Sequence, residues 1–197
     1  MLTVILTGGQ SRRMGRDKAL LEWEGAPACL TLAKRFRTLG PVAFSVSEKG
    51  RVPAGEYPEF PDAFPGAGPL NGLYSAFTQT AEDTVFLTAT DLLCGDPALA
   101  AELRDRCGEH LGCAIQRRSG KIETLFAIYK RGCLKAVEEA LNGGRRAMMR
   151  VFDCCDILLL GEDEFPGWDL DRILFNANTP EDLRRMTAGK YAEGGEA

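Results

Sequence analysis

Apolar runs and amphipathic segments alternate along most of this chain. Residues 84–89 read TVFLTA, and a strand that is apolar on both faces is typical of the interior of a parallel sheet. Residues 27–39 instead carry apolar side chains at intervals of about three, with basic ones between them, which predicts an amphipathic helix. Similar patterns predict further strands at 4–6, 42–46, 59–62, 113–116, 123–129 and 157–160, and further helices at 70–79, 96–107, 133–141, just after 145 and from 180. The alternation indicates a three-layer α/β/α sandwich with a mostly parallel sheet, which an antiparallel pair at 113–129 makes mixed.

The chain length suits one domain. Of the 197 residues we expect 1–190 to form it, because no repeat or linker interrupts the pattern. Residues 191–197 are polar and rich in glycine, so we expect a disordered tail there. Residues 162–171 are acidic, and we expect them to form a solvated loop.

A glycine-rich and strongly basic stretch follows the first predicted strand. Gly8 and Gly9 have no Cβ, so the backbone there can approach a ligand closely and present successive N–H groups to an anion. Four cations then fall within seven residues: Arg12, Arg13, Arg16 and Lys18. We interpret this stretch as a cradle for a polyphosphate, and the alternative is a basic, solvated loop after an edge strand.

The stretch matches neither of the two commonest phosphate loops. A Walker loop needs four residues between its glycines and then Lys-Ser/Thr, whereas five residues separate Gly9 from Gly15, and Ala19 follows Lys18. A Rossmann fingerprint needs G-x-G-x-x-G, which Gly8-Gly9 does not begin.

Composition narrows the class of ligand. A net charge of −4 and a pI near 5.2 argue against nucleic-acid or anionic-membrane binding, because the clustered basic residues are local to one loop. No apolar run is as long as a membrane span and no signal peptide is visible, so we expect a cytoplasmic protein. Seven scattered cysteines without a C-x-x-C, beside the single His110, favour reduced thiols over disulfides or zinc.

Asp91 comes directly after Thr90 at the end of the predicted strand 84–89. Ligands of parallel sheets bind beyond the carboxyl ends of the strands, and Mg²⁺ takes one or two carboxylates together with waters and substrate phosphates. We therefore interpret Asp91 as a Mg²⁺ ligand, and the alternative is a cap for the following turn.

The first loop resembles the signature of nucleotidyltransferases. The pattern G-G-x-S-x-R-M-G-x-D-K is filled by Gly8, Gly9, Ser11, Arg13, Met14, Gly15, Asp17 and Lys18. It is most similar to the loop of the molybdenum cofactor guanylyltransferase family. Residues 68–73 resemble that family's G-P-L-x-G-L element, and residues 176–183 its C-terminal N-x-N-T-P-E-D-L element. The chain departs from the family at Leu93, where a proline is usual, and at Ser45, near which the family has an asparagine.

The resemblance implies a Rossmann-like nucleotidyltransferase fold, that of nucleotide-diphospho-sugar transferases. It also implies an enzyme that transfers GMP from GTP to the phosphate of molybdopterin, with Mg²⁺, and releases pyrophosphate. GTP and molybdopterin would be the ligands, and molybdoenzymes or their cofactor-insertion chaperones transient partners. The choice of GTP over CTP is inferred from Gly8-Gly9, because relatives that use CTP tend to have alanine at the first position. The alternatives are a cytidylyltransferase acting on molybdopterin, a sugar-phosphate nucleotidyltransferase, and a non-catalytic nucleotide-binding protein.

The resemblance also implies roles for single residues. Lys18 and Arg13 would hold the phosphates, and Asp62 would contact the nucleoside. Arg145 and Arg146 would hold the phosphate of the pterin, although both also suit ordinary charges at a helix end. The full nucleotide set comprises Leu6, Thr7, Gly8, Gly9, Ser11, Gly15, Lys18, Ser45, Asp62, Gly68, Gly72 and Asp91, and the pterin set comprises Arg145, Arg146, Asn176 and Asn178. For residues 68–73 the alternative is a simple junction between a loop and a helix.

Overall fold

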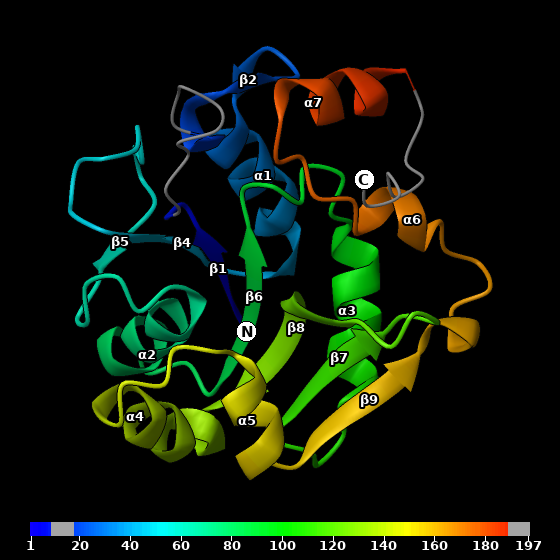
Figure 1. Ribbon diagram of the computed structural model, residues 1–197. Coiled ribbons are helices and arrows are strands. Elements are labelled where there is room, and N and C mark those ends of the chain that lie inside the picture. The colour runs from blue at the N-terminus through cyan, green and yellow to red at the C-terminus, as the bar shows by residue number, and fades with distance from the viewer. Residues whose placement is uncertain (9–17, 189–197) are drawn as a thin grey trace.

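A seven-stranded sheet runs through the middle of the protein (Figure 1). The structure is a computed structural model that describes residues 1–8 and 18–188. The predicted site residues Gly9, Ser11, Arg13 and Gly15, and the expected tail at 191–197, lie outside the described residues. The strand order is β5-β4-β1-β6-β8-β7-β9, formed by β5 (Glu59–Pro61), β4 (Val42–Val46), β1 (Leu2–Leu6), β6 (Thr84–Ala89), β8 (Ile122–Lys130), β7 (Gly112–Gln116) and β9 (Ile157–Gly161).

The sheet is mixed because one strand runs against its neighbours. β5, β4, β1 and β6 pair in parallel, as do β7 and β9, whereas β8 is antiparallel to both β6 and β7. The predicted antiparallel pair near residues 113–129 is therefore confirmed. The described residues also form a small hairpin, β2 (Glu22–Trp23) with β3 (Ala26–Pro27).

Helices cover both faces of the sheet. The α-helices are α1 (Ala28–Phe36), α2 (Pro69–Gln79), α3 (Pro97–Arg106), α4 (Leu134–Asn142), α5 (Met149–Cys154), α6 (Leu170–Ile173) and α7 (Pro180–Thr187). The 3-10 helices are η1 (Lys18–Leu20), η2 (Arg37–Leu39), η3 (Arg131–Cys133) and η4 (Glu162–Glu164). Helices α1 and α3 pack on one face, and α2, α4 and α5 on the other (Figure 1). Successive side chains of a strand point to opposite faces of the sheet, and each face has its own hydrophobic core. Ile5 of β1 belongs to the core under α1 and α3, whereas Val4 and Leu6 belong to the core under α2, α4 and α5.

Two details differ from the sequence expectation. The hairpin β2–β3 was not predicted, because its strands are only two residues long. The expected solvated loop at 162–171 is wrong in part: six of its ten residues are exposed, but Phe165 and Leu170 are buried, and the side chain of Glu162 is 19% exposed because it pairs with Arg117. This segment forms η4 and the start of α6.

The parallel strands place their carboxyl ends at one edge of the sheet. Leu6 is opposite both Ser45 and Ala89, and Val46 is opposite Pro61. The segments that leave β1, β4, β5 and β6 therefore begin side by side.

All seven cysteines are free. None of the helices within residues 1–8 and 18–188 is both long and apolar enough to cross a lipid bilayer.

Candidate functional site

Backbone hydrogen bonds hold the starts of the loops together at the carboxyl edge. The N–H and the Oγ1 of Thr7 both donate to the carbonyl oxygen of Ser45, at 3.1 and 2.7 Å. The N–H of Thr90 donates to the carbonyl oxygen of Leu6 at 3.1 Å. The ends of β1, β4 and β6 thus form a rigid base from which the first loop and Asp91 leave.

Asp91 is half-buried and meets the C-terminal part of the chain. Its carbonyl oxygen accepts a hydrogen bond from the N–H of Ala177 at 2.9 Å. This bond brings Asn176 and Asn178, which flank Ala177, to the same edge. Asn176 is half-buried and its Nδ2 donates to the carbonyl oxygen of Leu174 at 3.3 Å, while Asn178 is exposed. The structure therefore places the two asparagines beside Asp91.

Asp62 follows β5 and is hydrogen-bonded to both β4 and α2. Its N–H donates to the carbonyl oxygen of Val46 at 2.9 Å, and its Oδ1 accepts a hydrogen bond from Nδ2 of Asn71 on α2. Burial raises the pKa of this carboxyl, and the bond from Asn71 and the charge of Arg51 oppose that rise. A half-buried carboxyl with a raised pKa in a loop at a sheet edge is a candidate for ligand binding.

Two predicted glycines, Gly68 directly before α2 and Gly72 within it, have different physical roles. Gly68 is exposed, has φ +65°, and a Cβ there would meet open space, so its requirement is conformational. A Cβ on Gly72 would lie 2.3 Å from Cδ2 of Leu6 and 2.9 Å from Oγ of Ser45. Gly72 therefore lets α2 pack closely against β1 and β4.

The other residues predicted to bind the nucleotide are partly buried and partly exposed. Leu6, Thr7 and Ser45 are at most 6% exposed, and Ser45 turns its hydroxyl toward Gly72 and α2. Gly8 is exposed, and a Cβ there would meet no atom of residues 1–8 or 18–188 within 4 Å. Lys18 begins η1, and its side chain is not among those described.

The paired arginines precede α5 and are both exposed. Nη1 of Arg146 donates to the carbonyl oxygen of Gly66 at 2.9 Å. Gly66 lies in the loop between Asp62 and Gly68. Arg146, which is expected near the second substrate, is thus joined to the loop expected near the nucleotide. Arg145 is held by its backbone, whose N–H donates to Ala140 at the end of α4.

Sequence reasoning overlooked one residue of this site, Asn71. It is fully buried, and besides its bond to Asp62 its Oδ1 accepts from the N–H of Phe64 at 2.8 Å. Asn71 occupies the variable position of the G-P-L-x-G-L element, so the motif gave no signal for it. The only indication of its role would have been an amide side chain on the buried face of α2, close to a loop that carries a carboxylate.

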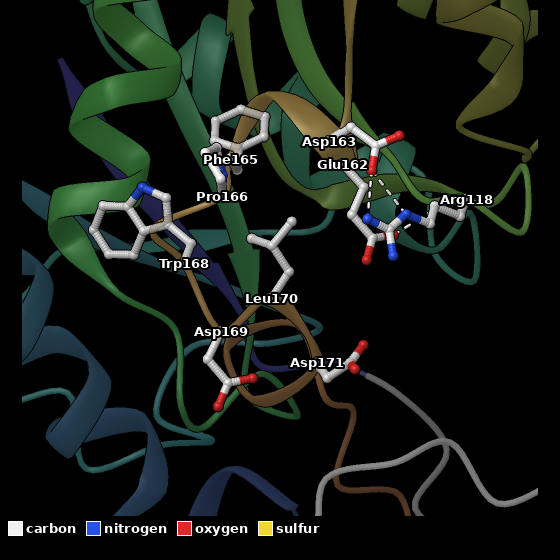
Figure 2. A pocket seen from close by; sticks show the side chains of 9 residues that line it. All are labelled: Arg118, Glu162, Asp163, Phe165, Pro166, Trp168, Asp169, Leu170 and Asp171. Carbon is white, nitrogen blue, oxygen red and sulfur yellow. Dashed lines mark hydrogen bonds and ion pairs between the residues drawn. The ribbon is translucent and has the colours of Figure 1, made fainter.

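A separate hollow lies near the outer edge of the sheet (Figure 2). Its volume is about 250 Å³, and it is lined by Arg118, Glu162, Asp163, Phe165, Pro166, Trp168, Asp169, Leu170 and Asp171. Four of these residues are acidic and one is basic, and Arg118 is paired with Asp163. An excess of carboxylates repels phosphate, so this hollow does not suit a nucleotide.

Comparisons with known proteins place the chain. The model of the "MobA-like NTP transferase domain" family matches residues 3–156. A protein of Pelotomaculum thermopropionicum named "Probable molybdenum cofactor guanylyltransferase" is 31% identical over 91% of this chain and 88% of its own length. A protein of the same name from Carboxydothermus hydrogenoformans is 29% identical over 94% of each chain.

Solved structures confirm the predicted fold. Molybdopterin-guanine dinucleotide biosynthesis protein A from Archaeoglobus fulgidus superposes with a TM-score of 0.80 at 20% identity, over 94% of this chain and 96% of that one. The 2-C-methyl-D-erythritol 4-phosphate cytidylyltransferase of Thermus thermophilus superposes with a TM-score of 0.68 at 12% identity, over 98% of each. The matches to the domain model and to the named relatives show that this chain belongs to the MobA-like NTP transferase family.

Proposed function

We propose that this protein transfers the GMP moiety of GTP to the phosphate group of molybdopterin and releases pyrophosphate. Relatives named molybdenum cofactor guanylyltransferase cover more than nine-tenths of the chain, which supports this choice. The observation that carries the proposal is the carboxyl edge. There the glycine-rich basic loop follows β1, and Asp91 follows the adjacent β6.

The reaction needs charge neutralisation more than proton transfer. The attacking group is a phosphate monoester with a second pKa near 6, so it is already largely dianionic at neutral pH. The barrier arises from the approach of two anions, which bound cations and fixed N–H groups lower. In this proposal Lys18 and Arg13 hold the triphosphate, the backbone from Leu6 to Gly8 lines the nucleotide, and Asp62 contacts the nucleoside.

The donor set at the edge fits Mg²⁺. Within the described part of the chain, no group of three or more His, Cys, Asp or Glu side chains could hold a metal by itself. Asp91 is half-buried at the edge, and Mg²⁺ needs only one or two carboxylates when substrate phosphates and waters complete its shell. When bound, the ion would neutralise charge on the triphosphate. Asp91 would hold it there.

The pterin would lie on the other side of Asp91. The bond from the N–H of Ala177 to the main-chain carbonyl oxygen of Asp91 brings the backbone of Asn176 and Asn178 next to that of Asp91. Arg145 and Arg146 are exposed cations near the loop at Gly66, where they could meet the pterin phosphate. This side of the site is proposed from the resemblance together with these contacts.

Calorimetric titration with GTP and with CTP, each with and without Mg²⁺, tests the proposal. We expect the wild type to bind GTP more tightly than CTP, with Mg²⁺ strengthening the binding and Asp91→Asn removing that gain. In turnover assays, Lys18→Ala and Asp91→Ala should each lower the rate by about a hundredfold or more while the fold is kept.

Asp163→Asn is the matched control. Asp163 is 74% exposed and lies at the separate hollow, so its loss should leave binding and turnover unchanged. Tighter CTP binding would assign the protein to a cytidylyltransferase instead. Binding of neither nucleotide, or full turnover by a folded Asp91→Ala variant, would contradict the proposal.

A further inference from the structure

Asn71 joins α2 to two points of the loop that follows β5. Its Nδ2 donates to Oδ1 of Asp62, and its Oδ1 accepts from the N–H of Phe64 at 2.8 Å. Its own N–H donates to the carbonyl oxygen of Gly68 at 3.1 Å. An amide bonded at both ends cannot rotate without breaking a bond in a buried place, so it fixes the orientation of both partners.

The loop that Asn71 holds joins two residues of the predicted nucleotide set, Asp62 and Gly68. Ala67 donates to the carbonyl oxygen of Phe64 at 3.1 Å, and the ring of Phe64 packs edge-on against Tyr74 of α2 at 5.2 Å. Asp62 and Gly68 lie at the two ends of this loop. Its shape therefore depends on the contact with α2.

The bond to Asn71 also commits one oxygen of Asp62. Within residues 1–8 and 18–188, no second hydrogen bond to this carboxylate is seen. Because the bond from Asn71 holds Oδ1, it also fixes the direction of Oδ2, the oxygen that would accept from a ribose hydroxyl in this proposal. The nearby charge that favours ionised Asp62 is Arg51.

We propose that Asn71 is a positioning residue of the nucleotide site, which orients the Asp62 carboxylate toward the nucleoside of GTP and fixes the loop from Asp62 to Gly68. The inference rests on the proposed function, in which Asp62 contacts the nucleoside. Asn71 acts through Asp62 and the loop, because it is itself fully buried.

Calorimetric titration with GTP and Mg²⁺ on matched variants tests this role. Asn71→Leu keeps the side-chain size but removes both bonds, and it should lower GTP affinity by about tenfold or more. Ser75→Ala is the control: Ser75 is also fully buried on α2, and its Oγ donates to the carbonyl oxygen of Pro61 at 3.1 Å. It should change affinity by less than about threefold. A folded Asn71→Leu variant with wild-type affinity, or an equal loss in Ser75→Ala, would overturn the proposal.

Two further variants separate positioning from general damage. In an Asp62→Asn background, Asn71→Leu should cost little additional affinity, and an undiminished loss there would count against the proposal. Asn71→Asp keeps the shape and the acceptor for Phe64, but it places two carboxyls at hydrogen-bond distance. Its GTP affinity relative to wild type should fall as pH rises, and a ratio independent of pH would refute the role. This variant also decides the question if Asn71→Leu fails to fold.

An NMR titration of the Asp62 carboxyl without nucleotide separates this inference from the proposed function. Loss of the bond that opposes the effect of burial should raise the pKa of Asp62 in Asn71→Leu above its wild-type value. A wild-type protein that binds no GTP would contradict the proposed function, and the titration would still show whether Asn71 controls Asp62. An unchanged pKa would overturn the inference.

Discussion

Gly72 shows how one residue can support the site without touching a ligand. It lies on α2 where the helix crosses β1 and β4, and a Cβ there would come within 2.3 Å of Leu6 and 2.9 Å of Ser45. Real Cβ atoms do not approach so closely, so the side chains of Leu6 and Ser45, or the elements that carry them, would have to move. Leu6 is the last residue of β1, the strand from which the first loop leaves.

We predict that Gly72→Ala destabilises the protein by about 1–3 kcal/mol, as overpacking of a well-filled core usually does. Urea unfolding measures this. Gly167→Ala is the control, because a Cβ there meets nothing within 4 Å and the backbone is not in the left-handed region. It should change stability by less than about 0.5 kcal/mol. Equal effects of the two substitutions would show that close packing is not what Gly72 provides.

Residue types predicted part of the site, and packing supplied the rest. Asp91 could be placed from the sequence because a buried strand ends directly before it, and the structure puts it at the carboxyl edge. The bond between Asn71 and Asp62 could not be predicted from the sequence. The two residues are nine positions apart and are separated by a loop and the first turn of α2. The sequence likewise did not show that Ser45 turns its hydroxyl toward α2.

At the scale of elements, local patterns were enough wherever a segment is long and buried. β4 and β6 begin and end where the apolar runs predicted, and Asp96 caps α3 because its Oδ1 accepts a hydrogen bond from the N–H of Ala98 at 2.8 Å. The pattern failed at residues 162–171, because Glu162 pairs with Arg117, 45 positions earlier. Such long-range pairing leaves no local signal in the sequence.

Helix α7 begins with a capping box that can be tested. Oγ1 of Thr179 accepts from the N–H of Asp182 at 3.1 Å, and Oδ2 of Asp182 accepts from the N–H of Thr179 at 2.7 Å. Thr179→Ala removes half of this capping box and should cost about 1 kcal/mol in the free energy of unfolding. Urea unfolding checks it, with Thr78→Ala as the control.

Thr78 is also a helix threonine, but it is exposed and its Oγ1 bonds to Tyr74 within the same helix at 2.9 Å. Its loss should be nearly neutral. Because the segment before Thr179 is bonded to Asp91 through Ala177, fraying of α7 should also reach the proposed metal ligand. If Thr179→Ala is as stable as the control, the cap does not hold this helix in place.

At the scale of the whole molecule, ion pairs fasten the outer edge of the sheet to the C-terminal segment. Arg117, which follows β7, donates through Nε to Oε2 of Glu162 at 2.9 Å and also pairs with Asp171 (Figure 2 shows Glu162 and Asp171). The same Oε2 accepts from the N–H of Arg118 at 3.0 Å. The side chains of Arg117 and Glu162 are only 10% and 19% exposed, so this pair is largely removed from water, whereas Asp171 is 63% exposed.

This cluster makes the stability of the protein sensitive to acid in a way that can be assigned to one residue. The backbone N–H of Arg118 and the guanidinium of Arg117 lower the pKa of Glu162 below its ordinary value. A carboxyl whose pKa is lower in the folded state stabilises the fold above its unfolded pKa, and that contribution is lost as pH falls through its folded pKa.

We predict that Glu162→Gln costs roughly 1–3 kcal/mol at neutral pH, the range for hydrogen bonds to charged groups. The difference from wild type should shrink as the pH is lowered from about 5 to about 3, where wild-type Glu162 is protonated too. Urea unfolding across that range measures it, with Asp163→Asn as the control, because both Asp163 and its partner Arg118 are 74% exposed and such a pair contributes little. A wild-type advantage that does not change with pH would mean that packing, and not the charge of Glu162, holds the hairpin of β7 and β8 to the C-terminal segment.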